Sequence, residues 1–231
     1  MTTAKTFAKE FSTITLVLIP VAIAINIVIG QIVVLLQLPV FLDSIGTMLV
    51  AVVAGPLAGA LTGALTNVIW GLAVDAIALP WWPVAFFIGL VTGLCALAGL
   101  FKSWWKVIIT GFLVALTAAI VSTPIAVYIY GGITGSGSSL ITAYLLQTGR
   151  DLIPAVLSTN FLVEPVDKIT TALLTFAIIG GLSQRYLARF PRPQNVQIER
   201  GNRSTQIIAA ILVAVVLVAI YAFFIFPILP E

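Results

Sequence analysis

Long apolar segments recur along the chain, and short segments between them hold most of the polar and charged residues. A helix needs about 20 apolar residues to cross the hydrocarbon core of a bilayer. The segments carry glycine at helical spacing and lack the alternation of a lipid-facing strand, so they predict helices rather than a barrel. The predicted spans are 14–36, 40–54, 57–74, 83–101, 107–130, 161–182 and 207–226.

The composition supports the same fold class, because 61% of the 231 residues are hydrophobic, only 8% are charged and the mean hydropathy is +1.18. A soluble domain cannot bury that much apolar surface. We therefore predict an all-α, polytopic membrane protein, with a six-helix membrane domain over 1–190, a basic cytoplasmic linker over 191–205 and an additional transmembrane helix over 206–231. The net charge of +3 comes from scattered residues and gives no basis for nucleic-acid binding.

The distribution of basic residues predicts the orientation, since Lys and Arg are enriched in short cytoplasmic loops. With a cytoplasmic N-terminus, only Arg150 and Lys168 fall on the outer side. The basic residues that then lie inside are Lys5, Lys9, Lys102, Lys106, Arg185, Arg189, Arg192, Arg200 and Arg203. The reverse orientation would place this whole set outside, so we predict an inside N-terminus and an outside C-terminus.

The chain lacks residues that metal binding and several kinds of catalysis require. The chain has no histidine, which is the commonest metal ligand and the usual base beside a catalytic Ser or Cys. The one cysteine, Cys95, lies in an apolar segment and is interpreted as a packing residue. There is also no Walker A or HExxH motif. We therefore predict a protein that is not an enzyme, with no catalytic residue, metal or cofactor.

Acidic residues gather at the predicted outer ends of the spans. Ionisable groups near membrane depth are costly and usually face a bundle interior or a wet cavity. Glu164 and Asp167 lie three residues apart at the start of a span, and Lys168 can pair with Glu164 at i+4. Together with polar and aromatic residues at other helix ends, they predict an outward-facing pocket. The predicted substrate-binding residues are Asp43, Asn67, Asp75, Trp81, Trp82, Asn160, Glu164 and Asp167.

Part of this set of predicted binding residues has a simpler, non-functional interpretation. Asp75 can simply solvate a loop end, and Trp81 and Trp82 have the composition of an interfacial aromatic belt. The segment 131–160, which begins GGITGSGSS and continues with LITAYLLQ, is too short to cross a bilayer. We expect it to lie in the outer interface or to fold back over the bundle as a lid, because loops of this length usually serve a function.

A stripe of small residues in the first span consists of Ala22, Asn26 and Gly30. Small residues at four-residue intervals allow another helix to approach closely. Asn26 lies at mid-membrane and needs a hydrogen-bonding partner, which either another span or a second protein can supply. We predict these three residues as a partner-binding face. A second stripe, from Gly55 to Asn67, is typical of packing within the chain.

Two segments resemble a known family. FLDSIGTMLVAVVAGPLAGALTGALTNVI, residues 41–69, resembles the second and third helices of the substrate-binding S components of energy-coupling factor vitamin transporters, with an Asp-initiated short helix, a Gly-Pro hairpin and a Gly-rich helix. EPVDKITTALLTFAIIGGL, residues 164–182, resembles the last helix of that family. The resemblance covers roughly residues 10–190 and implies a six-helix subunit that captures a vitamin from outside. It further implies that the first helix docks on a transmembrane coupling protein driven by two ATPases. The seventh span is not part of that pattern.

These observations favour a substrate-binding subunit of a membrane transporter in a prokaryotic plasma membrane, with coupling and ATPase subunits, the lipid bilayer and a vitamin-like small molecule as its partners. An acid-rich pocket without histidine leans toward a cationic or amine-bearing ligand with a flat ring. Two alternatives stay open. One is a non-transporting accessory or sensor-like subunit of a larger membrane complex, and the other is an intramembrane enzyme.

Overall fold

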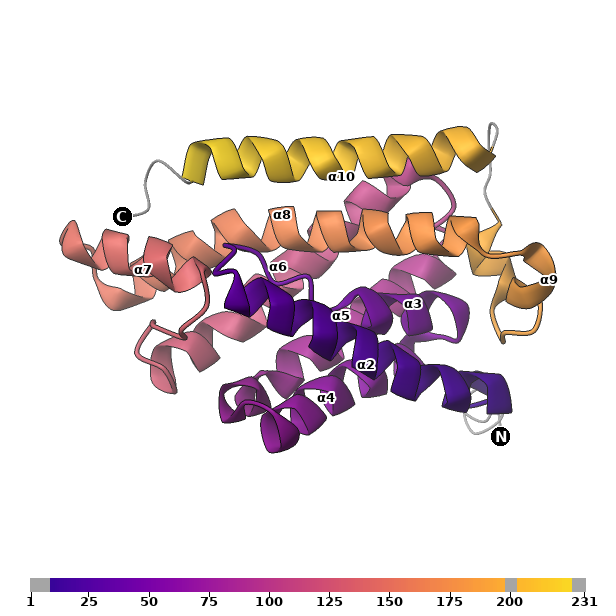
Figure 1. Ribbon diagram of the computed structural model, residues 1–231, viewed down its shortest axis with the longest axis horizontal. Helices are drawn as coiled ribbons and strands as arrows, with labels where there is room; N and C mark the ends of the chain where they lie inside the picture. The colour runs from indigo at the N-terminus through magenta and orange to yellow at the C-terminus, as the bar shows by residue number, and fades with distance from the viewer. Residues whose placement is uncertain (1–8, 198–202, 226–231) are drawn as a thin grey trace.

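The computed structural model describes residues 9–197 and 203–225, and all regular structure in these two ranges is helical (Figure 1). The elements are α2 (Thr13–Leu35), α3 (Ile45–Val53), α4 (Pro56–Ala73), the 3-10 helix η1 (Ala76–Trp81), α5 (Trp82–Leu97), α6 (Trp104–Tyr128), α7 (Ser138–Gln147), α8 (Leu152–Gly181), α9 (Gln184–Leu187), the 3-10 helix η2 (Pro193–Val196) and α10 (Arg203–Ile225). Lys5, Arg200 and the predicted end of the last span at Phe226 lie outside the described residues.

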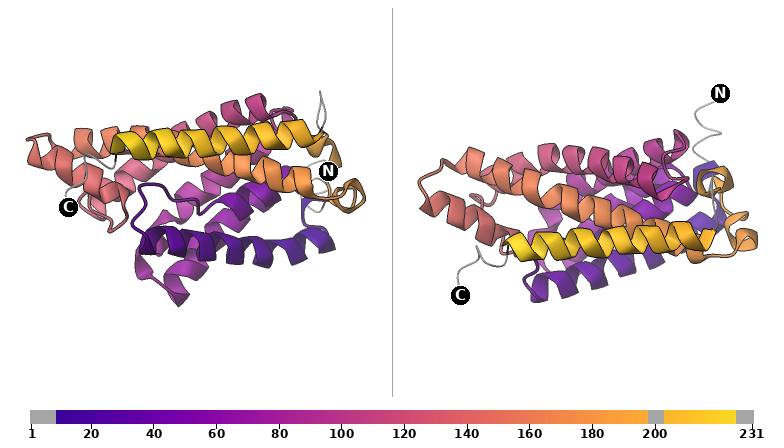
Figure 2. Two further views of the ribbon diagram at one scale, coloured as in Figure 1. Left: turned by 45° about the horizontal axis from the view of Figure 1, so that its top comes forward. Right: turned by 90° about the horizontal axis from the view of Figure 1, so that it is seen from above.

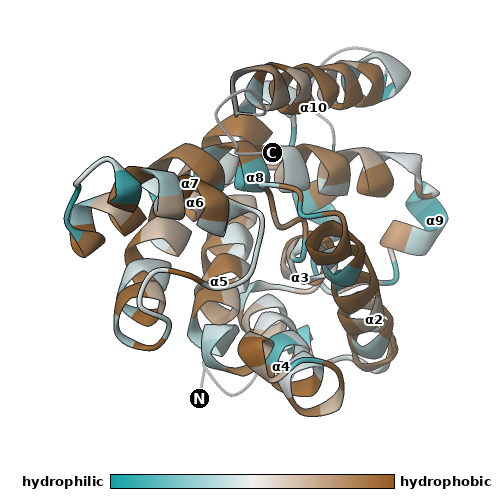
Figure 3. Ribbon diagram, turned by 60° about the vertical axis from the view of Figure 1, so that its left-hand side comes forward, coloured by the Kyte–Doolittle hydropathy of each residue, from teal (hydrophilic) through white to brown (hydrophobic). Residues whose placement is uncertain are grey.

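Five segments of the described chain are long and apolar enough to cross a membrane. They are Thr13–Leu35, Pro56–Ala73, Ala76–Leu97, Trp104–Tyr128 and Arg203–Phe223. Apolar residues dominate α2 and α10 in Figure 3, and many of their large apolar side chains are exposed, as Val17 and Val28 are on α2 and Val215 is on α10. Exposed apolar surface of this extent suits contact with lipid. The prediction of an all-α protein is confirmed, and several membrane-crossing helices support a multi-pass membrane protein.

Two predicted spans differ from the helices observed. The second, predicted over 40–54, is the nine-residue helix α3, every residue of which is buried. Nine residues extend only about 14 Å, about half the hydrocarbon thickness. The sixth, predicted to begin at Phe161, is the 30-residue helix α8, which begins at Leu152. Its first turns contain polar residues, which a hydropathy criterion places outside a membrane span. The side-chain NH2 group of Asn160, however, donates hydrogen bonds to Ser122 and Thr123 of α6 inside the protein.

The helix α8 lies between α6 and α10, and α10 runs along it in the views of Figures 1 and 2. The side chain of Arg203 at the start of α10 donates to the carbonyls of Ile179 and Leu182 at the end of α8. Ile207 fills the space left by Gly180, where a Cβ atom would overlap its side chain. The additional C-terminal helix is therefore docked on the helix bundle, and the docking uses backbone carbonyls at the end of α8 as acceptors.

The stripe on α2 faces inward. The amide nitrogen of Asn26 donates to Thr47 Oγ1 at 2.9 Å and Thr66 Oγ1 at 3.1 Å, and its oxygen accepts from the backbone N–H of Gly46 at 2.7 Å. A Cβ atom at Gly46 would overlap the backbone carbonyl of Ala22. Of the two partners left open for Asn26, the structure thus shows other helices of the same chain.

This inward packing corrects the prediction of a partner-binding face. Ala22, Asn26 and Gly30 are all buried, and Gly30 packs against the ring of Trp70. The sequence gives the spacing of the stripe but not the direction in which it points, and α3 and α4 occupy that side of α2. In this structure the three residues are not accessible to another protein.

The end of the molecule that holds α9 is rich in basic residues. They are Lys9, Lys102, Lys106, Arg185, Arg189, Arg192 and Arg203. Here Glu10 caps α4, because its Oε2 accepts from the backbone N–H groups of Leu57 at 2.9 Å and Ala58 at 3.2 Å. Gly55, with φ of +137°, leaves room for this carboxylate, and the predicted Gly-Pro hairpin between α3 and α4 is confirmed.

We predict that Ala22→Leu destabilises the protein, because a larger side chain has no space against α3. Overpacking of this kind costs about 1–3 kcal/mol. The matched control is Ala24→Leu, since Ala24 is exposed on the same helix. Thermal unfolding in detergent measures both variants. If the Ala22 variant unfolds at the temperature of the unmodified protein and loses only its association with another protein, the internal role of the stripe is wrong.

Candidate functional site

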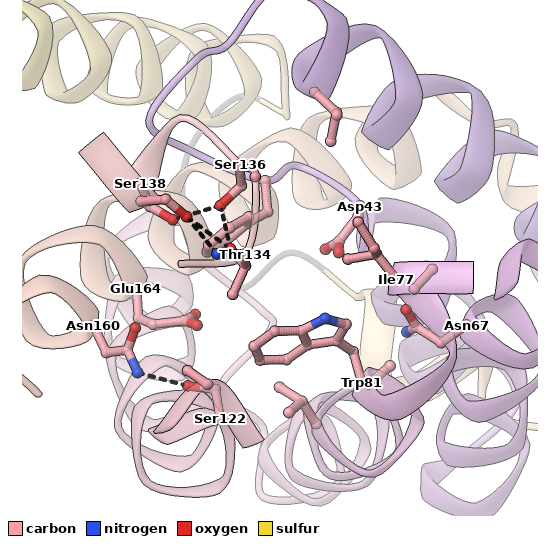
Figure 4. Close-up of a pocket in the computed structure, with 18 of the residues that line it drawn as sticks. Asp43, Asn67, Ile77, Trp81, Ser122, Thr134, Ser136, Ser138, Asn160 and Glu164 are labelled. Carbon is pink, nitrogen blue, oxygen red and sulfur yellow. Dashed lines mark hydrogen bonds between the residues drawn. The ribbon is translucent and has the colours of Figure 1, made fainter. Parts of the chain in front are cut away.

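A cavity of about 180 Å³ lies at the end of the molecule opposite the basic end (Figure 4). Its walls come from the end of α2, from the segment before α3, from α4, η1, α5, α6 and α8, and from the segment that includes the start of α7. The walls are mostly apolar, with polar groups at a few positions, which is the usual character of a small-molecule site. The ends of helices far apart in sequence thus converge on one cavity.

Six of the eight predicted site residues line this cavity. They are Asp43, Asn67, Asp75, Trp81, Asn160 and Glu164. The amide of Asn67 makes no hydrogen bond to the described part of the chain, and Figure 4 draws it in the cavity wall on the side opposite Asn160. Asp75 also caps η1, its Oδ1 accepting from the backbone N–H of Ile77 at 3.1 Å.

Trp82 does not line the cavity, and its side chain is 47% exposed. Successive residues at the junction of η1 and α5 point in different directions, so Trp81 faces inward while Trp82 faces outward. The exposed position of Trp82 agrees with the interpretation of an interfacial aromatic belt. Trp82 is therefore not one of the residues that line the pocket, contrary to the prediction.

Asp167 is also absent from the cavity wall, because it lies behind that wall and is 0% exposed. Its Oδ1 accepts from the backbone N–H groups of Phe41 at 2.9 Å and Leu42 at 2.7 Å. Leu42 has φ of +52°, an uncommon conformation for a residue other than glycine. We therefore reassign Asp167 from a ligand contact to an anchor for the segment that carries Asp43 into the cavity.

Lys168 also lines the cavity but was not among the predicted binding residues. Its i+4 spacing from Glu164 was the feature of the sequence that could have identified it. It is 2% exposed, and its Nζ lies 2.5 Å from Asp167 Oδ2, 3.7 Å from Asp43 Oδ1 and 3.7 Å from Glu164 Oε2. One ammonium group is thus shared by three carboxyl groups, two of them on its own helix. A buried lysine requires such partners, because an unpaired charge inside a membrane protein is very costly.

An aromatic pair supports another part of the wall, which is lined by Trp81 but not by its partner Tyr130. The rings of Trp81 and Tyr130 are stacked, with centroids 5.5 Å apart and an interplanar angle of 2°. The hydroxyl of Tyr130 donates to the carbonyl of Ile77 at 2.7 Å, which ties the end of α6 to η1. Burial, reinforced by the negative charge of Asp75, raises the pKa of Tyr130, so its hydroxyl stays protonated and keeps this hydrogen bond at neutral pH.

The segment 134–139, which ends in the first turn of α7, contributes a group of linked hydroxyls that sequence reasoning did not single out. Thr134 and Ser136 are bonded at 2.9 Å, Ser136 and Ser138 at 2.8 Å, and Ser139 accepts from the backbone N–H of Thr134 at 2.9 Å. All four residues line the cavity. Part of the segment 131–160, from Gly132 to Thr142, therefore contributes to the cavity wall, residues 152–160 belong to α8, and whether the segment acts as a lid stays a prediction.

Comparison of the chain with protein-family models, with curated proteins and with solved structures found no match. The described residues contain no cluster of three or more His, Cys, Asp or Glu side chains placed to hold a metal ion. What the site offers chemically is a set of hydroxyls, amides and carboxylates around an apolar space. Such a set is suited to binding an organic molecule by hydrogen bonds and charge.

We predict that Asp167→Ala lowers the free energy of unfolding by about 3–5 kcal/mol, because it leaves Lys168 without its nearest counter-charge and two backbone N–H groups without an acceptor. Asp151→Ala is the matched control, since Asp151 is an exposed acid at the start of the same helix. Equilibrium unfolding in mixed detergent measures the difference. Equal stability of the two variants would contradict the anchoring role of Asp167.

Proposed function

We propose that this chain is the substrate-binding subunit of a membrane transporter, and that it captures a vitamin-like small molecule from outside for ATP-driven uptake powered by partner subunits. The observation that carries the proposal is the cavity at one end of a bundle of membrane-crossing helices, into which Glu164 and Lys168 project from the middle of α8. Buried ionisable groups at such a position mark solute sites in membrane proteins.

The charge distribution supports an outward-facing cavity. All basic residues of the described chain except Arg150 and Lys168 gather at the end that holds α9, and basic loops are retained in the cytoplasm. The cavity lies at the opposite end, so this orientation opens it to the outside of a prokaryotic cell. The solute then enters from the medium, and the N-terminal end of α2 lies in the cytoplasm.

The resemblance to energy-coupling factor S components supports the same function. The features that carry it are the short helix α3 after Asp43, the Gly-Pro turn and the glycine-lined helix α4. In this chain they place Asp43 and Asn67 in the cavity wall. On this proposal α2, α3, α4, α5, α6 and α8 form the six-helix bundle and α10 is the additional helix.

The proposal also requires partners. The sequence holds no nucleotide-binding motif, so the energy for uptake comes from a transmembrane coupling protein and ATPase subunits. Because Ala22, Asn26 and Gly30 are packed inside the chain, these partners contact a different surface. An accessory subunit of another membrane complex would show the same fold, so the identity of the partners separates the two functions.

Purification of the tagged chain from its native membranes tests the proposal. We expect ATPase and coupling subunits to copurify, together with a small molecule that mass spectrometry detects after denaturation. Trp81→Ala should lower the amount of retained molecule by about fivefold or more, because loss of a stacked aromatic contact costs about 1 kcal/mol or more. Trp82→Ala should leave it unchanged. Copurification with a respiratory or pigment complex, and without ATPases, would support the accessory role instead.

We predict opposite accessibility for the two ends of the molecule. In a protein with Cys95 replaced by Ala, Thr148→Cys and Gln184→Cys each place a thiol at an exposed position, one after α7 and one at the start of α9. A membrane-impermeant maleimide should label the first in intact spheroplasts and the second only after permeabilisation. The reverse pattern would overturn the proposed orientation.

A further inference from the structure

One cavity-lining carboxylate lacks the donors that a buried carboxylate needs. Glu164 is 4% exposed, and among the described residues its Oε2 has no hydrogen-bond partner. The Nζ atom of Lys168 is 3.7 Å away, which is within ion-pair range but beyond hydrogen-bond distance. In Figure 4 the carboxyl group of Glu164 points into the cavity toward Trp81. A ligand that donates an N–H to this oxygen would remove the cost of leaving it unsatisfied.

The charges of the cavity wall favour a positive ligand. Asp43, Asp75 and Glu164 line the cavity, whereas Lys168 is the only basic residue among the lining residues. Counting Asp43 and Asp75 as −1 each and the ammonium as +1 gives a formal charge of −1 for the wall, which becomes −2 when Glu164 is ionised. Lys168 is moreover closest to Asp167, behind the wall. A low-dielectric surrounding strengthens the attraction of such a site for a cation and its repulsion of an anion.

The size of the cavity limits the ligand to one ring with short substituents. The volume is about 180 Å³, while a cavity of about 150 Å³ holds benzene and sites for drug-sized molecules start at about 300 Å³. The indole of Trp81 lies in the wall across the cavity from Glu164 (Figure 4). An indole face is the best aromatic partner for a cation, and it also stacks on a flat ring.

We infer that the cavity binds a compact, single-ring organic cation whose N–H group donates to Glu164 and whose ring or charged group lies against Trp81. The inference rests on the proposed function, because it names the class of solute that the transporter would capture. The hydroxyls of the segment 134–139 and the amide of Asn67 are left to bind polar substituents of that ring.

A panel of probes with the same ring and different charge tests this inference. Benzylammonium, benzyl alcohol and benzoate are titrated onto the purified chain in lipid nanodiscs, and binding is measured by saturation-transfer NMR and by the thermal stability of the protein. We expect benzylammonium to bind about tenfold or more tightly than benzyl alcohol, and benzoate not to bind. Equal binding of the cation and the alcohol, or tighter binding of benzoate, would overturn the inference.

The role of Glu164 is tested with Glu164→Gln, which keeps the size of the side chain and removes its charge. We expect this variant to lose about tenfold in affinity for benzylammonium and to keep its affinity for benzyl alcohol. Asp151→Asn, the same chemical change at an exposed acid of the same helix, should bind like the unmodified protein. An unchanged affinity for benzylammonium in Glu164→Gln would overturn the assignment of Glu164. If this variant fails to fold, the three-probe comparison on the unmodified chain still decides the charge of the ligand.

These results are distinguishable from failure of the proposed function. A chain that prefers the cation but copurifies without ATPase subunits would keep the inferred ligand class and lose the transport role. A chain that copurifies with ATPase subunits and retains an anionic molecule would keep the transport role and lose the inferred ligand class.

Discussion

The ammonium group of Lys168 lies among three carboxyl groups near one end of the helix bundle, and the geometry of the cavity depends on it. Asp167 holds Lys168 with one oxygen and the backbone of Phe41 and Leu42 with the other, so α8 and the segment before α3 are fixed to each other. That segment then brings Asp43 to the cavity wall. Because a bilayer offers no water to an unpaired charge, the pairing is a condition for placing these groups so deep in the protein.

The helix α8 also organises the rest of the bundle. Gly111 of α6 allows close contact with Ile169 on one side, and Gly180 receives Ile207 of α10 on another. Tyr221 of α10 packs in an apolar cluster with Val33, Val40 and others, next to the segment that Asp167 anchors. The helix α10 therefore packs, through Tyr221, beside the segment that Asp167 anchors, which gives this helix a structural role near the site.

How far the sequence predicts this structure depends on what each pattern encodes. The length of apolar segments encodes membrane-crossing helices, and five of the seven predicted spans correspond to described helices that are long and apolar enough to cross a membrane. The limits of α3 and α8 were not predicted correctly, because tertiary hydrogen bonds such as that of Asn160 satisfy polar residues that a hydropathy pattern places in loops. The sequence also encodes the depth of a residue better than its direction around a helix. Most of the predicted site residues lie at similar depths in the membrane and line one cavity, as predicted. The side of the helix on which a residue lies was not predicted: Trp81 faces the cavity and Trp82 does not, and Asn26 faces the interior of the chain.

A comparison of two buried carboxylates at opposite ends of the molecule supports a ligand site at the cavity. Glu10 is 2% exposed and its Oε2 accepts two backbone N–H groups, while Arg192 approaches its Oε1 at 3.4 Å. Glu164 is buried to the same degree, yet in the described structure its Oε2 has no donor. The protein therefore satisfies a buried carboxylate with its own groups where the role is to cap a helix. At the cavity the described residues supply no corresponding donor, and space for a small molecule lies beside the oxygen that needs it.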